Sequence, residues 1–160
     1  MKNFEIKIPV ERYEEASELN TNDFLLLQQA REASLLAYSP YSGFSVGAAV
    51  RLKNGVIVQG NNQENAAYPS GLCAERVALF FASSRYPGIP FEAIAVTART
   101  KARLISEPIA LCGSCRQVLS EYEMLHGQPI RIIMCGETGP VVVFEKASDL
   151  LPMNFSAKDL

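Results

Sequence analysis

The chain has 160 residues, of which 48% are hydrophobic and 20% charged, a balance that is ordinary for one folded domain and excludes disorder throughout. The formal net charge is −2 and no two lysines or arginines are adjacent, which argues against a nucleic-acid partner. No apolar stretch approaches the roughly 20 residues that cross a bilayer, and residues 1–10 alternate in polarity, unlike a signal peptide. We therefore predict a cytoplasmic protein without a membrane partner.

The predicted elements alternate along the chain. A helix is expected over residues 22–38, capped by Thr21, Asn22 or Asp23, and it ends before a turn at 39–43. Strands at 44–52 and 56–60 are joined by a hairpin signal at 53–55. Helices follow at 73–84 and 112–125, and strands at 91–98, 130–135 and 141–144. This order predicts a single α/β sandwich domain over residues 1–160, in which 1–20 form an N-terminal extension.

Three of the four cysteines stand where two of the predicted helices begin. Cys73 heads one helix, and Cys112 and Cys115 head the other, one helical turn apart. A helix N-terminus favours a thiolate over a thiol, and disulfides are rare in the cytoplasm. Three thiolates can hold a zinc ion and leave its fourth position open for water. Glu75, two residues after Cys73, is placed to move the protons of that water.

The charge of such a site has to be balanced. Zinc with three thiolates carries a net negative charge, which opposes the ionisation of a bound water. Arg76 and Arg116 directly follow the cysteine motifs, and we expect them to withdraw negative charge from the sulfur atoms. A water pKa of about 7, as in efficient zinc enzymes, then becomes accessible.

Two plainer interpretations of the cysteines stay open at this point. A redox dithiol accounts for Cys112 and Cys115 but leaves Cys73 and Glu75 unexplained. A structural four-cysteine zinc site would need Cys135, which lies on a predicted apolar strand where a buried free cysteine requires no further role. The single histidine, His126, is expected near a helix end and at the surface.

Several blocks of the sequence resemble the small homotetrameric zinc-dependent cytidine deaminases. A glutamate two residues after a cysteine ligand, with a C-x-x-C downstream, is the signature of zinc nucleobase deaminases. The matching blocks run in the family's order: YSPYSGFSVGAA at 38–49, GNNQENAAY at 60–68, CAER at 73–76, CGSCRQ at 112–117 and LLPMNF at 150–155. Together they cover the chain from residue 38 to residue 155.

The resemblance implies a fold, a reaction and a cofactor. The fold would be a three-layer α/β/α sandwich with a mixed five-stranded sheet. The reaction would be hydrolytic deamination of cytidine and deoxycytidine to uridine and deoxyuridine, as in pyrimidine salvage. Cys73, Cys112 and Cys115 would be ligands of Zn²⁺, and Glu75 would be the proton shuttle.

The resemblance also implies a set of substrate contacts. Asn62 and Glu64 would hold the ribose hydroxyls, Phe44 would stack on the base, and the Ala74 backbone would bind the base carbonyl. Phe155 would reach into a neighbouring subunit's site. The assembly would then be a homotetramer with shared active sites, acting on a small nucleoside.

One position departs from the family pattern, and two other functions stay open. Leu111 precedes the C-x-x-C where the family usually has proline, and leucine lacks the fixed φ angle of proline. The resemblance implies that the main chain there positions the leaving amino group. A deaminase of another aminated heterocycle, such as blasticidin S, shares the zinc motifs, although Asn62 and Glu64 favour a ribosyl substrate. A non-catalytic zinc or redox module is the third interpretation.

Overall fold

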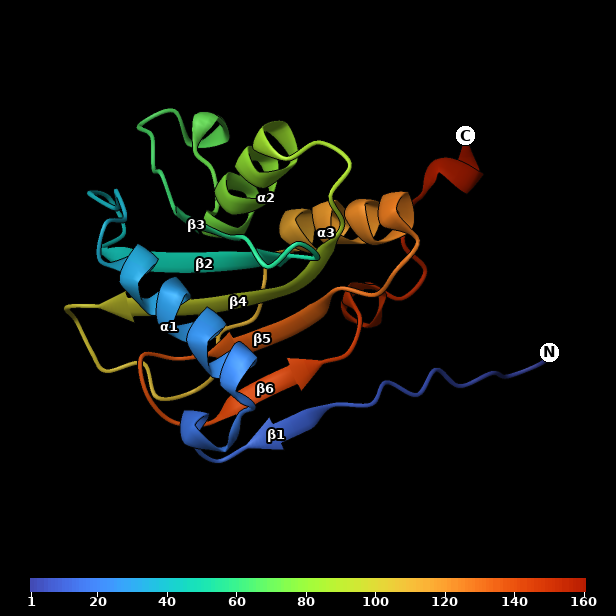
Figure 1. The fold of residues 1–160 in the computed structure, drawn as a ribbon, viewed down its shortest axis with the longest axis horizontal. Coiled ribbons are helices and arrows are strands. Elements are labelled where there is room, and N and C mark those ends of the chain that lie inside the picture. Colours follow the sequence, from blue (N-terminus) through green and yellow to red (C-terminus); the bar gives the residue numbers. More distant parts are fainter.

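Six strands form one mixed sheet in the computed structural model, which describes all 160 residues (Figure 1). Their order is β1-β6-β5-β4-β2-β3, and every neighbouring pair is antiparallel except β4 and β5, which are parallel. The strands are β1 (Glu11–Tyr13), β2 (Phe44–Leu52), β3 (Ile57–Asn61), β4 (Phe91–Thr100), β5 (Arg131–Cys135) and β6 (Val141–Phe144).

Helices cover both faces of this sheet, which confirms the predicted three-layer architecture. They are α1 (Thr21–Ser34), α2 (Ala74–Arg85) and α3 (Gly113–His126). Figure 1 shows α1 crossing one face, with α2 and α3 on the other. Four short 3₁₀ helices complete the chain: η1 (Ala16–Glu18), η2 (Tyr68–Ser70), η3 (Ala147–Leu150) and η4 (Ala157–Asp159). No helix combines the length and the apolar character needed to cross a membrane.

Alternate residues of the central strands point into two separate cores, because side chains along a strand alternate between its faces. The core beneath α2 and α3 takes Ala48, Val50, Ile94, Val96 and Ile132. The core beneath α1 takes Ala49, Ala93, Ala95, Ile133 and Cys135. The strands are therefore buried on both faces, as their nearly continuous apolar sequences indicate.

Two glycines of the family-like blocks let the helices pack close to the sheet. A Cβ atom on Gly60 of β3 would lie 2.5 Å from the Ala78 amide nitrogen of α2. A Cβ atom on Gly47 of β2 would overlap the Ala30 carbonyl oxygen of α1. Any side chain at either position would push a helix away from the sheet, and at Gly60 that helix is the one that begins at Cys73.

The predicted number of five strands is wrong by one. The additional strand, β1, comes from the N-terminal extension and pairs with β6 through Glu11–Val143 and Tyr13–Val141. Helix α1 also differs from its predicted bounds. Its cap is Asn20, whose side chain accepts a hydrogen bond from the Asp23 amide, and it ends at Ser34.

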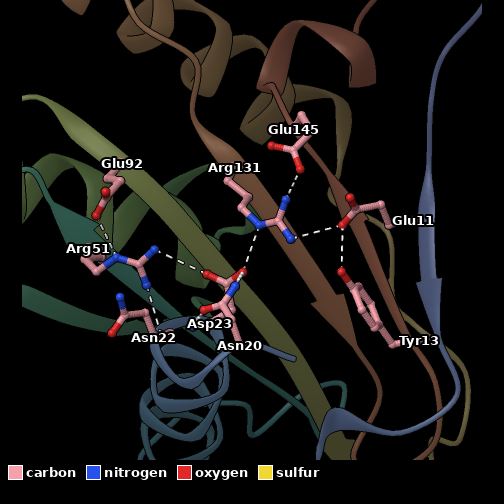
Figure 2. A network of polar contacts seen from close by, with 9 residues as sticks. All are labelled: Glu11, Tyr13, Asn20, Asn22, Asp23, Arg51, Glu92, Arg131 and Glu145. Atoms are coloured by element: carbon pink, nitrogen blue, oxygen red, sulfur yellow. Dashed lines mark hydrogen bonds and ion pairs between the residues drawn. The ribbon is translucent and has the colours of Figure 1, made fainter. Parts of the chain in front are cut away.

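A buried carboxylate joins α1 to the sheet (Figure 2). Asp23 is 1% exposed, and its two oxygens accept hydrogen bonds from Arg131 Nε at 2.8 Å and Arg51 Nη2 at 3.3 Å. Arg131 also contacts Glu11 of β1 and Glu145, which follows β6. The two arginines come from β5 and β2, so this network fixes α1 across the sheet and holds β1 at its edge.

Candidate active site

The N-termini of α2 and α3 meet and bring the three predicted cysteines together. Cys73 and Cys112 are the N-cap residues of these helices, and Cys115 lies in the first turn of α3. Their sulfur atoms all lie within 4.8 Å of one another, with 3.8 Å between Cys73 Sγ and Cys112 Sγ. All four cysteines of the chain are free thiols. The spacing of these residues in the sequence therefore translates into a single cluster.

This cluster has the dimensions of a zinc site. Two sulfurs bound to a tetrahedral zinc at about 2.3 Å are about 3.8 Å apart. Cys73 and Cys112 have that separation. Cys115 is buried, whereas Cys112 is exposed and Cys73 half-buried, so the cluster is open on one side. Three such ligands with one open side are the arrangement of a catalytic zinc centre rather than a structural one.

The two remaining candidates for metal ligation lie elsewhere. Cys135 packs beneath α1, on the opposite face of the sheet, where Arg31 Nη2 approaches its sulfur at 3.6 Å. His126, at the end of α3, meets the ring of Phe91 edge to face with the ring centroids 5.2 Å apart, and it stacks on Tyr122. The structure therefore offers no fourth protein ligand from either residue.

The thiols of this cluster differ in their pKa values. The pKa of Cys73 is lowered to about 5, chiefly by its hydrogen bond with Cys115 and further by Arg76, whose Nη2 lies 3.6 Å from the sulfur. The same contact with Cys73, together with burial, raises the pKa of Cys115. These opposite shifts indicate that, without a cation, the cluster does not hold three thiolates. Only a bound cation favours three thiolates at this spacing.

Of the two arginines predicted to tune the sulfur charge, only Arg76 touches a sulfur atom. Arg116 turns away, and its Nε donates to the Leu111 carbonyl oxygen at 2.8 Å and its Nη1 to that of Leu150 at 3.2 Å. A tuning role for Arg116 stays a prediction. Its contacts instead fix the main chain just before Cys112.

Leu111 is held in place by its surroundings. Its side chain is 3% exposed and belongs to the core that contains Cys115 and Leu119. Its carbonyl oxygen accepts a hydrogen bond from Arg116. Leu111 is therefore restrained both at its side chain and at its carbonyl group. Burial and this hydrogen bond thus supply a restraint that proline would supply through its ring.

Glu75 lies in the first turn of α2 and is 4% exposed. Burial raises the pKa of its carboxyl group, and the charge on Cys73 adds to this effect. A carboxyl group with a pKa shifted toward neutrality can both accept and donate a proton at physiological pH.

A cavity of about 510 Å³ opens beside the cysteine cluster. Its volume is within the usual range for small-molecule sites, about 300–1,000 Å³. Its lining includes three of the residues predicted to bind substrate, Phe44, Asn62 and Glu64. It also includes Glu75 and two of the predicted zinc ligands, Cys73 and Cys112.

The predicted ribose ligands are firmly oriented at the cavity wall. Asn62 Oδ1 accepts from the Val46 amide at 2.8 Å, and Asn62 Nδ2 donates to the Phe44 carbonyl at 2.9 Å. Glu64 accepts hydrogen bonds from the Ser42 hydroxyl and, at 2.9 Å, from the Tyr41 amide. The bond from Ser42 lowers the pKa of Glu64, which is therefore an ionised acceptor.

Two of the predicted substrate-binding residues do not line this cavity. The Ala74 side chain is buried in the core, so only its main chain is available to a ligand. Phe155 is 60% exposed on the C-terminal segment, where its carbonyl accepts a 2.8 Å hydrogen bond from Gln117 Nε2.

Sequence reasoning missed part of the cavity wall. Tyr41, Tyr68 and Ile109 also line it, and the rings of Tyr41 and Tyr68 meet edge to face at 6.5 Å. The two tyrosines stand inside family-like blocks, and Ile109 shortly precedes the C-x-x-C, so proximity to the motifs was the available signal.

Comparisons with known proteins agree with this geometry. Residues 20–126 match the family described as the cytidine and deoxycytidylate deaminase zinc-binding region. The cytidine deaminase of Halalkalibacterium halodurans is 40% identical over 136 residues, covering 85% of this chain and 96% of the relative. That of Sporosarcina psychrophila is 38% identical over 144 residues, covering 84% and 92%. The crystal structure of cytidine deaminase from Burkholderia pseudomallei superposes with a TM-score of 0.71 at 41% identity, covering 82% of this chain and 97% of that one.

Proposed function

The chain belongs to the cytidine and deoxycytidylate deaminase family, and from this premise we propose that it hydrolyses cytidine and deoxycytidine to uridine and deoxyuridine, releasing ammonia in pyrimidine salvage. The observation that carries the proposal is the convergence of three cysteines and the buried Glu75 beside one cavity of nucleoside size.

Zinc is the cofactor that fits the cysteine cluster. Cys73, Cys112 and Cys115 would hold it, and when bound it supplies a Lewis acid that brings the pKa of water toward neutrality. Arg76, in contact with Cys73, offsets part of the negative charge of the thiolates.

Glu75 performs the proton transfers. It takes a proton from water as the oxygen attacks the amino-bearing ring carbon, and it delivers that proton to the adjacent ring nitrogen. The carbon then carries both a hydroxyl and an amino group. Glu75 moves the hydroxyl proton to the amino group, the carbon–nitrogen bond breaks, and ammonia leaves as the carbonyl forms. Because burial raises the pKa of Glu75, its carboxyl group is suited both to accepting and to donating a proton.

The remaining cavity residues bind and orient the nucleoside. The ionised Glu64 accepts hydrogen bonds from ribose hydroxyls, beside Asn62. The Phe44 ring at the cavity wall stacks on the base. The amide of Ala74, the first residue of α2, is one of the donors that a helix leaves free, and it binds the base carbonyl.

The cavity is completed by a neighbouring subunit. Phe155 is exposed and lies outside the cavity of its own chain. A homotetramer in which Phe155 enters a neighbour's cavity covers this aromatic side chain and closes the site. Light scattering after gel filtration tests the assembly, with four chains per particle expected and a monomer contradicting it.

A substrate panel tests the reaction. Ultraviolet absorbance with cytidine, deoxycytidine and blasticidin S, together with zinc content on the same sample, separates the alternatives. We expect turnover of both nucleosides and about one zinc per chain. Turnover of blasticidin S alone would assign another aminated heterocycle, and zinc binding without ammonia release from any compound would indicate a non-catalytic module.

A further inference from the structure

A second cavity, of about 780 Å³, lies behind the turn that borders the candidate active site. The two cavities share one residue, Ser42. They lie on opposite faces of the start of β2, since Phe44 and Val46 line the first and Ser45 the second. The second cavity plays no part in the deamination argued above.

This second cavity is positively charged. Arg99 and Lys101 line it, and no carboxylate does. The antiparallel register of β2 and β4 places Arg99 directly opposite Ser45. Lys101 forms no ion pair, and the one carboxylate that pairs with Arg99 is Glu137, at 4.0 Å. Because the whole chain has a net charge of −2, this cationic wall is a local feature.

Hydroxyl groups around the two cations add hydrogen-bond donors. Ser39 Oγ and Ser45 Oγ are 2.8 Å apart, and this bond uses one of their two protons and leaves the other free. Thr100 Oγ1 accepts from the Ala102 amide at 3.3 Å and also keeps its own proton to donate. Cations together with hydroxyl donors, without a lining carboxylate, are the chemistry that binds phosphate.

The size of the cavity and one aromatic ring indicate more than a simple ion. Small-molecule sites of about 300–1,000 Å³ accommodate ligands the size of a nucleotide. Tyr38, 54% exposed, lines the same cavity and offers a ring on which a base can stack. We propose that this cavity binds a nucleoside phosphate, with the phosphates on Arg99 and Lys101 and the base against Tyr38.

The shared wall links such a ligand to the first cavity. The amide and the hydroxyl of Ser42 both donate to Glu64, which lines the candidate active site. A ligand that moves the turn at 39–43 therefore moves Glu64 and changes the KM of the nucleoside substrate.

Calorimetric titration of the zinc-loaded protein with adenosine 5′-triphosphate at low salt tests the proposal. Its purine base separates the probe from the pyrimidine substrate. We expect saturable binding of one molecule per chain. Lys101→Glu should weaken the Kd by about tenfold or more, as expected for losing a charge-assisted hydrogen bond. The control Lys53→Glu makes the same charge change in the β2–β3 hairpin, at the other end of β2, and should leave the Kd unchanged.

Two outcomes would overturn the proposal. One is the absence of saturable binding to the unaltered protein. The other is equal weakening by the two substitutions, which would reduce the effect to overall charge. Wild-type nucleoside turnover by Lys101→Glu, measured on the same sample, shows that the variant is folded. Failure of the proposed deamination would appear as missing turnover in all three proteins and leaves the binding comparison intact.

Discussion

We propose that Arg76 adjusts the charge of the cysteine cluster, since its Nη2 lies 3.6 Å from Cys73 Sγ. Three thiolates exceed the charge of one zinc ion, so a cation beside them favours the ionisation of water at the metal. The guanidinium lines the same cavity as Glu75 and Cys112 and therefore acts on the reacting region directly.

Replacing Arg76 should lower turnover without emptying the site. We expect Arg76→Gln to reduce kcat by about 10–100-fold, the usual effect of residues that support metal ligands. Arg85→Gln, in the last turn of the same helix, is the matched control and should retain the wild-type rate. Equal rates for the two variants in the absorbance assay would contradict this role.

His126 makes stability depend on pH. Its Nε2 atom is buried without a hydrogen-bond partner, and burial lowers the pKa of its ring. The aromatic rings of Phe91 and Tyr122 pack against it. Because the folded-state pKa is lowered, the buried ring resists protonation. The contribution of neutral His126 to the free energy of unfolding is therefore complete above about pH 6.5, and it is lost as pH falls through the folded-state pKa.

Urea unfolding at pH 7.5 and pH 5 measures this contribution. The free energy of unfolding should fall less between the two pH values in His126→Phe than in the unaltered protein. The comparison of variant with wild type cancels the acid-induced loss of zinc that both share. An identical fall in both proteins would show that His126 makes no contribution.

At the scale of elements, the first turn of α3 organises three parts of the site. This part of the helix bears Cys115. The side chain of Arg116 binds the main-chain carbonyls of Leu111 and Leu150. The side chain of Gln117 binds the carbonyl of Phe155. Figure 1 shows the C-terminal segment emerging beside α3. One helix thus connects the proposed zinc ligands to Phe155, the side chain that we propose enters a neighbouring subunit's cavity.

A double-mutant cycle tests this connection. Phe155→Ala should raise KM by about 2- to 12-fold, the factor that corresponds to losing an aromatic contact worth about 0.5–1.5 kcal/mol. Gln117→Ala should raise KM by a smaller factor, but it should add nothing in the Phe155→Ala background, because no ring remains to be positioned. Effects that multiply would show that Gln117 acts independently of Phe155.

The strands and helices that have a clear pattern within their own sequence were predicted correctly. The apolar runs of β2, β4 and β5 and the cysteine-headed helices are where they were expected. Strand β1 was missed because Glu11–Tyr13 has no strand-like pattern, and its partners are Val141–143 and Arg131, far along the chain. Helix α1 ends at Ser34, before its predicted end, and the chain continues to a bridge between Tyr38 and Gln63.

The same holds for the candidate site: positions within short motifs could be predicted, whereas contacts with distant parts of the chain could not. Fixed spacings predicted that Cys73, Cys112 and Cys115 come together near Glu75, and the structure brings the three sulfurs into one cluster at two helix starts. The sequence could not show that Arg116 turns to backbone carbonyls, because its partner Leu150 lies in η3, 34 residues further along the chain.

For the whole molecule, Asp23 is the residue that ties the layers together. Removing its charge leaves Arg51 and Arg131 without their buried partner (Figure 2). Asp23→Asn should lower the free energy of unfolding by about 3–5 kcal/mol, the range for breaking a buried ion pair. Glu145→Gln, at a carboxylate 59% exposed, should cost less than about 1 kcal/mol. Similar losses in urea unfolding would contradict the central position of Asp23.

The fold serves the site by bringing two helix starts to one cavity, where we propose that Glu75 transfers the protons of the reaction. The most direct test is turnover of cytidine by Glu75→Gln, with zinc measured on the same preparation. Zinc should stay near one per chain while kcat falls by about 10²–10⁴-fold, the range for a positioned acid–base group. A zinc-loaded variant that deaminates cytidine at the wild-type rate would contradict the assignment of Glu75.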